Sequence, residues 1–186
     1  MNIKFIRKTY RTFKHKVYYI LFGSVKYAAK IGVNFVQRDV KIYGKVSWGS
    51  EPWIIKLGKA VHITDGVKFI THDGGVLLFR DKIPDLEITK PITIGDNVYI
   101  GNNVILLPGV NVGNNVVIGA GAVVTKDIPN DSVSVGVPAR VIKTLEDYYL
   151  KIRTESIHLG NLYGEEKDNA LKNYYGYKGK HKGIYW

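Results

Sequence analysis

The stretch "PITIGDNVYIGNNVILLPGVNVGNNVVIGAGAVVT", residues 91–125, carries an aliphatic side chain at every sixth position. These positions are Ile94, Ile100, Leu106, Val112, Ile118 and Val124. Six residues are three periods of a β-strand, so side chains six apart point to the same face. A second aliphatic series lies four residues after the first: Val98, Val104, Val110, Val116 and Ala122. The two series predict a short strand and a sharp corner in every six residues.

The residues between the two series are those expected at corners. Glycine follows most members of the first series, and Asn-Asn or Asp-Asn pairs come next; the glycines are Gly95, Gly101, Gly113 and Gly119. Both residue types favour corners that need a positive φ. Three strands and three corners close a triangle of about 18 residues, and such coils stack at about 4.8 Å. The pattern predicts an all-β solenoid, a parallel β-helix of triangular section.

Three segments resemble the hexapeptide-repeat acyltransferases: "KPITIGDNVYIGNNVILLPGVNVG", "IGAGAVVTKDIP" and "GVPARVIK". The similarity covers roughly residues 42–143 and is nearest to the maltose/galactoside acetyltransferase and polysaccharide O-acetyltransferase branch. The resemblance implies that the β-helix is left-handed and that acetyl-CoA is the acetyl donor. It also implies a homotrimer, with the donor held in the groove between subunits.

The repeat divides the chain into three predicted parts. Residues 1–35 form a basic amphipathic helical cap, residues 36–143 the β-helix, and residues 144–186 a C-terminal helix and tail. Within the β-helix the repeat slips at "SWGSEPWIIK" and is lost again between Phe69 and Ile94, which are 25 residues apart. Because 25 is not a multiple of six, residues 76–90 are predicted to leave the solenoid as an inserted loop.

Positive charge is concentrated at the start of the chain. The net charge is +11, and no acidic residue precedes Asp39. Apolar residues recur there at spacings of three and four: Ile3, Ile6, Tyr10, Phe13 and Val17. This pattern favours a basic amphipathic helix that caps the open end of the β-helix, and peripheral attachment to an anionic membrane stays open as an alternative. Nucleic-acid binding is not expected, because no recognition motif accompanies the charge.

Composition excludes several other classes of function. The chain has no cysteine, which removes disulfides, thiolate zinc sites and cysteine nucleophiles. It has no apolar run of about 18 residues and no signal-peptide pattern at its start. A cytoplasmic location is therefore expected, with contact at the inner face of the membrane as the alternative.

His72, in "ITHDGG", is the candidate catalytic residue. It follows a regular coil and precedes the inserted loop, where the similar acetyltransferases place their catalytic histidine. A neutral imidazole can take the proton of a hydroxyl as it attacks a thioester, and then return a proton to the leaving thiolate. Backbone N–H groups near Gly74 or Gly75 are candidates for stabilising the oxyanion, a role that the sequence leaves open.

Candidate acceptor-binding residues lie on both sides of the histidine in sequence. Glu51, in "GSEPW", falls where the sugar acetyltransferases carry an acidic residue that binds the acceptor, and Ser50 is beside it. The Glu51 carboxylate could accept bonds from sugar hydroxyls or brace His72. Asp73 is a further candidate, although a strand neighbour of His72 should point to the opposite face.

The resemblance places donor contacts at Asn102, Ala120, Thr125 and Lys126. Lys126 and Arg140, with Lys143 as a second lysine, are suited to the phosphates of coenzyme A. A three-histidine zinc site, as in carbonic anhydrases of this fold, is not expected, because His62 is the only other histidine within the repeat.

The function expected is acetyl-CoA-dependent O-acetylation of a sugar hydroxyl, in a bacterial surface polysaccharide or its precursor, by direct attack. N-acetylation of an amino sugar or nucleotide sugar, and acetylation of a small molecule such as serine or an antibiotic, stay open. The alternative outside the enzymes is a scaffold protein without catalytic activity.

Overall fold

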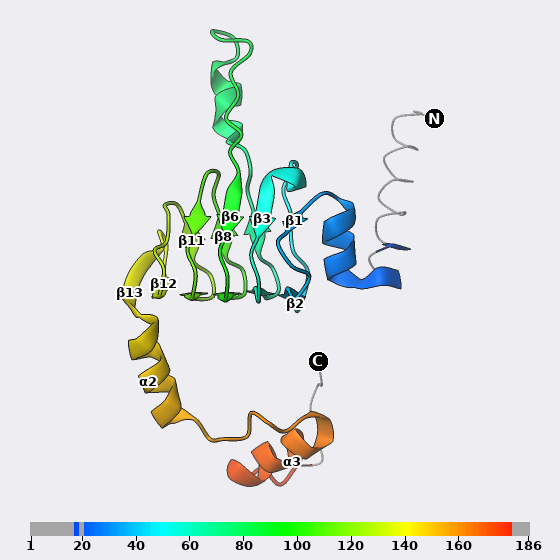
Figure 1. The fold of residues 1–186 in the computed structure, drawn as a ribbon, viewed down its shortest axis with the longest axis vertical. Helices are drawn as coiled ribbons and strands as arrows, with labels where there is room; N and C mark the ends of the chain where they lie inside the picture. Colours follow the sequence, from blue (N-terminus) through cyan, green and yellow to red (C-terminus); the bar gives the residue numbers. More distant parts are fainter. Residues whose placement is uncertain (1–16, 19–20, 180–186) are drawn as a thin grey trace. The chain divides into compact units, whose positions relative to one another are not determined.

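The computed structural model describes residues 17–18 and 21–179 of the chain, which divides into two units, Met1–Glu146 and Asp147–Trp186. The first unit is a solenoid of short strands stacked in three sheets (Figure 1). Among the described residues, every strand pairing is parallel except the one between the last two strands. The predicted parallel β-solenoid is thus present.

We call the three sheets faces A, B and C. Face A has the order β1 (Asn34–Phe35), β3 (Ile55–Leu57), β6 (Ile92–Ile94), β9 (Asn111–Val112). Face B has the order β13 (Arg140–Thr144), β12 (Ser132–Val135), β10 (Val116–Ile118), β7 (Val98–Ile100), β4 (His62–Ile63), β2 (Lys41–Ile42). Face C has the order β11 (Val123–Val124), β8 (Ile105–Leu106), β5 (Lys68–Phe69).

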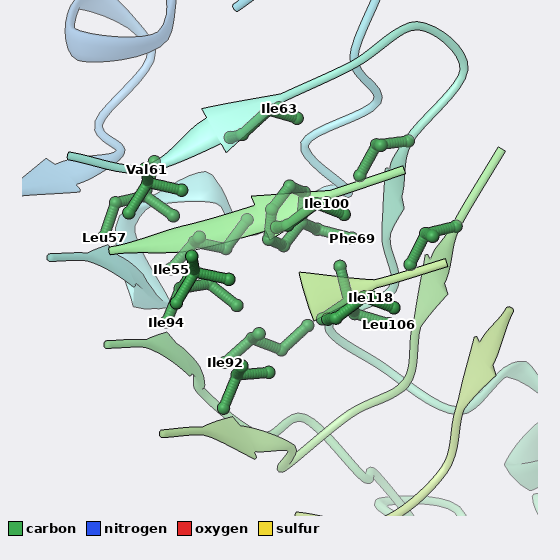
Figure 2. Packing of buried hydrophobic residues seen from close by; sticks show 14 of the residues in the cluster. Ile55, Leu57, Val61, Ile63, Phe69, Ile92, Ile94, Ile100, Leu106 and Ile118 are labelled. Carbon is green, nitrogen blue, oxygen red and sulfur yellow. The ribbon is translucent and has the colours of Figure 1, made fainter. Parts of the chain in front are cut away.

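Both aliphatic series of residues 94–124 point into the solenoid. Every member of the two series is at most 3% exposed, which confirms the predicted periodicity. Figure 2 shows side chains from successive coils, such as Ile63, Ile100 and Ile118, packed against one another between the strands. Removal of this apolar surface from water, at roughly 25 cal/mol per Å², is the main force that holds the coils together.

The corners of the solenoid use the two predicted residue types in different ways. Positive φ falls on the second residue of each polar pair, at Asn97, Asn115 and Asp131, whereas Gly95 and Gly113 do not have it. Of the two residue types expected at corners with positive φ, the polar pairs therefore supply it at these positions, and Gly95 and Gly113 do not. Glycine is needed at these positions for a steric reason. A Cβ on Gly95 would lie 2.6 Å from the Gly113 carbonyl oxygen of the next coil.

The polar corner residues also bond to each other from coil to coil. The side-chain amide of Asn97 donates to Asn115 Oδ1 at 2.9 Å, and the amide of Asn115 donates to Asp131 Oδ1 at 2.8 Å. This ladder follows one edge of the solenoid and ends on a carboxylate, which only accepts hydrogen bonds. The corners are thus joined by side chains as well as by the strand hydrogen bonds.

The predicted inserted loop leaves the solenoid, as Figure 1 shows. It begins with the 3₁₀ helix η2 (Gly74–Phe79), and an antiparallel bridge between His72 and Thr89 closes its base. Within η2, Leu77 and Leu78 are 63% and 82% exposed. The loop is therefore tied to the solenoid beside His72 and carries apolar side chains into solvent.

The first coils depart from the hexad pattern. Val36, which lies six residues before Ile42, is 49% exposed, whereas Trp48 is buried and stacks on Phe69 with 5.0 Å between ring centroids. The 3₁₀ helix η1 (Pro52–Ile54) then leads into β3. A buried tryptophan thus packs on the core where the hexad pattern is interrupted.

At the N-terminal side, residues 21–30 are helical and bury Ala28 against the solenoid core. Residues 1–16 and 19–20 of the predicted cap lie outside the described residues. At its other end the prediction of a helical cap to residue 35 is wrong, because Asn34–Phe35 form β1 and pair with β3.

The second unit contains most of α2 (Leu145–Glu155) and all of α3 (Gly164–Tyr174). The C-terminal helix was predicted, whereas α3 was not. Neither helix has a fully buried residue. Over the described part of the chain, no helix has the length and apolarity needed to cross a membrane.

Candidate active site

The structure places Glu51 beside His72. Ser47 and Lys68 form a parallel bridge in neighbouring coils, and the Phe69 amide donates to the Ser47 carbonyl at 2.9 Å. Glu51 follows Ser47 by four residues, and His72 follows Lys68 by four residues. The two side chains therefore lie side by side, and His72 Nδ1 is 3.1 Å from Glu51 Oε2. The imidazole side chain is 41% exposed and the carboxylate 24%. The pair is therefore held by the solenoid and open to a ligand on one side.

Thr71 completes this cluster. It is fully buried, and its hydroxyl donates to Glu51 Oε2 at 2.5 Å. This hydrogen bond holds the pKa of the Glu51 carboxyl below its usual value of 4.5, and the bond from His72 acts in the same direction against the effect of partial burial. An ionised carboxylate only accepts hydrogen bonds, so Nδ1 of His72 is the donor in this contact, and in a neutral imidazole the lone pair is then on Nε2.

Gly49 makes room for the same cluster. Its φ is +68°, and a Cβ there would lie 2.7 Å from Thr71 Oγ1 and 2.9 Å from the Phe69 carbonyl oxygen. A larger residue would therefore displace Thr71 or the strand behind it. Sequence reasoning missed both Gly49 and Thr71. A signal for Thr71 was present, because it continues the inward alternation of Val67 and Phe69 with a polar residue.

Replacement of Thr71 by valine is expected to lower stability at neutral pH by about 1 kcal/mol, because a buried hydrogen bond to a carboxylate is lost. A depressed carboxyl pKa contributes stability above the unfolded-state pKa, and this contribution is lost as the pH falls through the folded-state value. The deficit of the variant should therefore be largest near pH 7 and shrink below pH 4.5, the ordinary value of Glu51. Urea midpoints measured across this range test the expectation.

Thr93→Val is a suitable control, since Thr93 lies on an outer strand position of β6 and is partly exposed. It should show no such pH dependence. A Thr71→Val deficit that is the same at all pH values would mean that the hydroxyl does not act through the Glu51 carboxylate.

The other two predicted acceptor residues take different positions. Ser50 is exposed next to Glu51. Asp73 caps η2, where its Oδ1 accepts from the Gly75 amide at 2.8 Å. The Gly75 N–H therefore already donates to Asp73. Of the two glycine amides expected as candidates for stabilising the oxyanion, only that of Gly74 does not donate to Asp73.

The predicted donor residues lie at two edges of face C. Asn102 and Ala120 precede β8 and β11, whereas Thr125 and Lys126 follow β11 as His72 follows β5. In a parallel sheet, residues that precede the strands lie at one edge and residues that follow them lie at the opposite edge. Within one protomer, Thr125 and Lys126 thus lie at the same edge of face C as His72. Asn102 and Ala120 lie at the opposite edge.

The two remaining predicted cations lie at the last coil. The segment that leads to Arg140 runs beside β11, where the Ala139 amide donates to the Val123 carbonyl at 2.8 Å. Arg140 is exposed, and its Nη1 donates to the Ala139 carbonyl at 2.9 Å. Lys143 lies on β13 opposite Val133, on face B. Lys126 and Arg140 therefore bring an ammonium and a guanidinium group, respectively, near the end of face C, which suits the phosphates of coenzyme A.

His62 is not part of the candidate site. Its Nδ1 lies 2.8 Å from the Tyr43 hydroxyl, and the two rings are stacked. Of the side chains that the structure describes, no three His, Asp or Glu residues form a group that could hold a metal ion.

Comparisons with known proteins agree with this architecture. The model of the bacterial transferase hexapeptide family (six repeats) matches residues 91–126. Protein CapG of Staphylococcus aureus is 50% identical over 146 residues, which cover 77% of this chain and 84% of that protein. Galactoside O-acetyltransferase of Escherichia coli (strain K12) is 57% identical over 65 residues, about a third of each protein: 33% of this chain and 32% of the other.

Among solved structures, a maltose O-acetyltransferase from Clostridium difficile 630 superposes with a TM-score of 0.50 and 30% identity, over 64% of this chain and 73% of that one. The matched segment 91–126 is the regular part of the solenoid, and the identity to CapG extends over most of both chains. The chain belongs to the bacterial hexapeptide-repeat transferase family.

Proposed function

We propose that the protein is an acetyl-CoA-dependent O-acetyltransferase that acts on a sugar hydroxyl, in a bacterial surface polysaccharide or its precursor. The observation that carries the proposal is the hydrogen-bonded pair of Glu51 and His72 at the base of the inserted loop. Two relatives support the reaction class, since both the galactoside and the maltose enzymes are sugar O-acetyltransferases.

In the proposed mechanism, His72 Nε2 removes the proton of the acceptor hydroxyl as its oxygen attacks the thioester carbonyl. The resulting tetrahedral species collapses, the carbon–sulfur bond breaks, and the imidazolium returns the proton to the thiolate. The Glu51 carboxylate stabilises the imidazolium through Nδ1–H and holds the ring in one orientation, as in other carboxylate–histidine pairs. The acetyl group and the proton are thus both accounted for without an acyl-enzyme.

The donor is proposed to lie along face C, with its phosphates on Lys126 and Arg140; Lys143, the third cation expected from the resemblance, lies on face B. The remaining predicted contacts, Asn102, Ala120 and Thr125, would line the pantetheine. Because Asn102 and Ala120 lie on the edge away from His72, a second copy would have to supply them to a complete site. This supports the proposal of a homotrimer, and the coils are proposed to wind in the left-handed sense of the family.

Around the acceptor, Ser50, Glu51 and Asp73 are the residues proposed to contact sugar hydroxyls. A cytoplasmic location is proposed as well, and the absence of cysteine from the chain fits a reducing compartment.

The reaction class is tested by release of free thiol from acetyl-CoA with a panel of acceptors. The panel contains galactosides, maltose, oligosaccharides of surface polysaccharides, amino sugars, nucleotide sugars and serine. We expect turnover with neutral sugar hydroxyls and an acetyl ester as the product, identified by its lability to mild base. Turnover only with amines would show N-acetylation instead, and absence of coenzyme A binding in calorimetry would show a scaffold.

A further inference from the structure

One of the two tryptophans that the structure describes faces solvent beside the candidate active site. Trp48 is buried, whereas Trp53 is 59% exposed. Tryptophan side chains are highly buried on average, so a large exposed indole is informative. Trp53 follows Glu51 by two residues, in η1, and the intervening Pro52 is buried. Two trans peptide units keep the Cα atoms of Glu51 and Trp53 within about 7.6 Å of each other. The exposed ring is thus a close neighbour of the Glu51–His72 pair.

The backbone that carries Trp53 is held in place. The side-chain amide of Asn34 donates to the Trp53 carbonyl at 2.6 Å, and the Ile54 amide donates to the Glu51 carbonyl at 3.2 Å. Gly32 has a φ of +108°, and a Cβ there would lie 3.3 Å from the Trp53 Cβ. An indole on a fixed backbone has only two side-chain torsions to order when a ligand binds. Trp53 therefore offers a large contact area at a small entropic cost.

Trp53 lies on the side of the catalytic pair that faces away from the proposed donor. Glu51 contacts His72, which belongs to the following coil. Trp53 instead contacts Asn34 of β1, which is the preceding strand of face A. Lys126 follows β11, two strands beyond β5 on face C, in the direction opposite to β1. The donor side of the edge is therefore on one side of the histidine, and the tryptophan is on the other.

The chemistry around Trp53 suits a sugar ring. The two residues that precede Pro52 are Ser50, which is exposed, and Glu51, which is partly exposed. A pyranose has faces made of C–H groups and a rim made of hydroxyls. The face of an aromatic ring is electron-rich and attracts the C–H groups, while a carboxylate accepts hydrogen bonds from the hydroxyls. This edge offers both kinds of surface within one short segment.

We propose that Trp53 binds a second sugar unit of the acceptor, next to the unit whose hydroxyl is acetylated. The proposal rests on the proposed function, because it takes His72 as the base and Glu51 as an acceptor contact. The reacting unit contacts this pair, and the C–H face of the adjoining unit packs on the indole. The acceptor then extends along the edge away from the donor. Its class is accordingly an oligosaccharide or polysaccharide rather than a single sugar.

The test compares acceptors of different length: methyl galactoside, methyl glucoside and their linear oligomers of two to six units. The parent chain should have a higher kcat/KM for the oligomers. Trp53→Ala should lower kcat/KM for a hexasaccharide about tenfold, mainly through KM, because a binding contact outside the reacting unit is lost. Its kcat/KM for the single sugars and its KM for acetyl-CoA should change less than about twofold. Trp53→Phe keeps an aromatic face and should recover most of the loss.

Tyr99→Ala is the matched control, since Tyr99 is also an exposed aromatic residue, 44% exposed, but lies on β7 of face B. It should leave the preference for long acceptors unchanged. An equal loss with single sugars and hexasaccharides in Trp53→Ala would overturn the proposal and indicate a structural role. A change of oligomeric state in sedimentation would also overturn it and place the indole in a contact between copies.

Calorimetric titration of the free protein with the same sugars separates this proposal from the proposed function, because binding needs no turnover. Tighter binding of the oligomers to the parent chain than to Trp53→Ala would support the tryptophan contact even if none of the sugars were acetylated. Turnover without any preference for longer acceptors would leave the proposed function standing and overturn the contact. Equal binding to the parent chain and Trp53→Ala, or no binding of any oligomer, would overturn the contact as well.

Discussion

Replacement of His72 by alanine is expected to lower the turnover number for acetyl transfer by about 100-fold or more, the usual contribution of a positioned general base. The variant loses the nitrogen that would accept the hydroxyl proton, whereas the apolar core of the solenoid is untouched. Thiol release from acetyl-CoA, measured at saturating acceptor, gives the turnover number directly. Because His72 is 41% exposed, its removal leaves no buried cavity, and the urea midpoint should stay close to that of the parent chain.

His62→Ala is the matched control for this experiment. His62 lies in the same repeat and has a hydrogen bond of similar length, but its partner is Tyr43 on face B. Turnover of the His62 variant should be nearly normal. Added imidazole should restore part of the rate of His72→Ala, since the cavity left by the side chain is open to solvent. Near-normal turnover of His72→Ala would exclude His72 as the base.

Gly95→Ala is expected to destabilise the solenoid by about 3 kcal/mol, near the upper end of the usual cost of overpacking. Three glycines directly follow the strands of face A in successive coils: Gly58 after β3, Gly95 after β6 and Gly113 after β9. A Cβ on Gly95 would lie 2.5 Å from Asn114 Oδ1 and 2.6 Å from the Gly113 carbonyl oxygen. Because the Gly113 oxygen belongs to the backbone, the coils themselves would have to move apart.

The urea midpoint of Gly95→Ala, compared with that of Gly160→Ala, measures this effect. Gly160 has no heavy atom within 4 Å of the position that a Cβ would take, and its φ is not positive. Its substitution should change stability little. Equal midpoints for the two variants would mean that the coils can separate freely at face A.

The regular coils were predictable because their information is local. Each hexad needs only two inward apolar residues and a compact corner, and residues 94–124 repeat this without interruption. The sequence did not show which corner residue takes the positive φ, because glycine and asparagine both tolerate that conformation. In the structure Asn97 takes the positive φ, whereas Gly95 is required because the next coil leaves no room for a Cβ.

The candidate site was predicted in part. His72 was found from its place before the loop, and Glu51 from its resemblance to an acidic residue of the family. The contact between them depends on the parallel bridge of Ser47 and Lys68, which an irregular coil with a buried tryptophan makes hard to foresee. Helix α3 was missed because none of its residues is fully buried, so it lacks the strong apolar periodicity that identifies a helix in a sequence.

The reversed direction of β13 has a consequence for self-assembly. A solenoid that ended on a parallel strand would offer an open edge on which the first coil of another molecule could continue the same winding. Here the outermost strand of face B runs antiparallel to β12, and its register shifts between Val133 and Ser134. The antiparallel strand β13 therefore covers this edge of face B with a segment of the same chain. We expect it to oppose end-to-end growth of the solenoid into filaments.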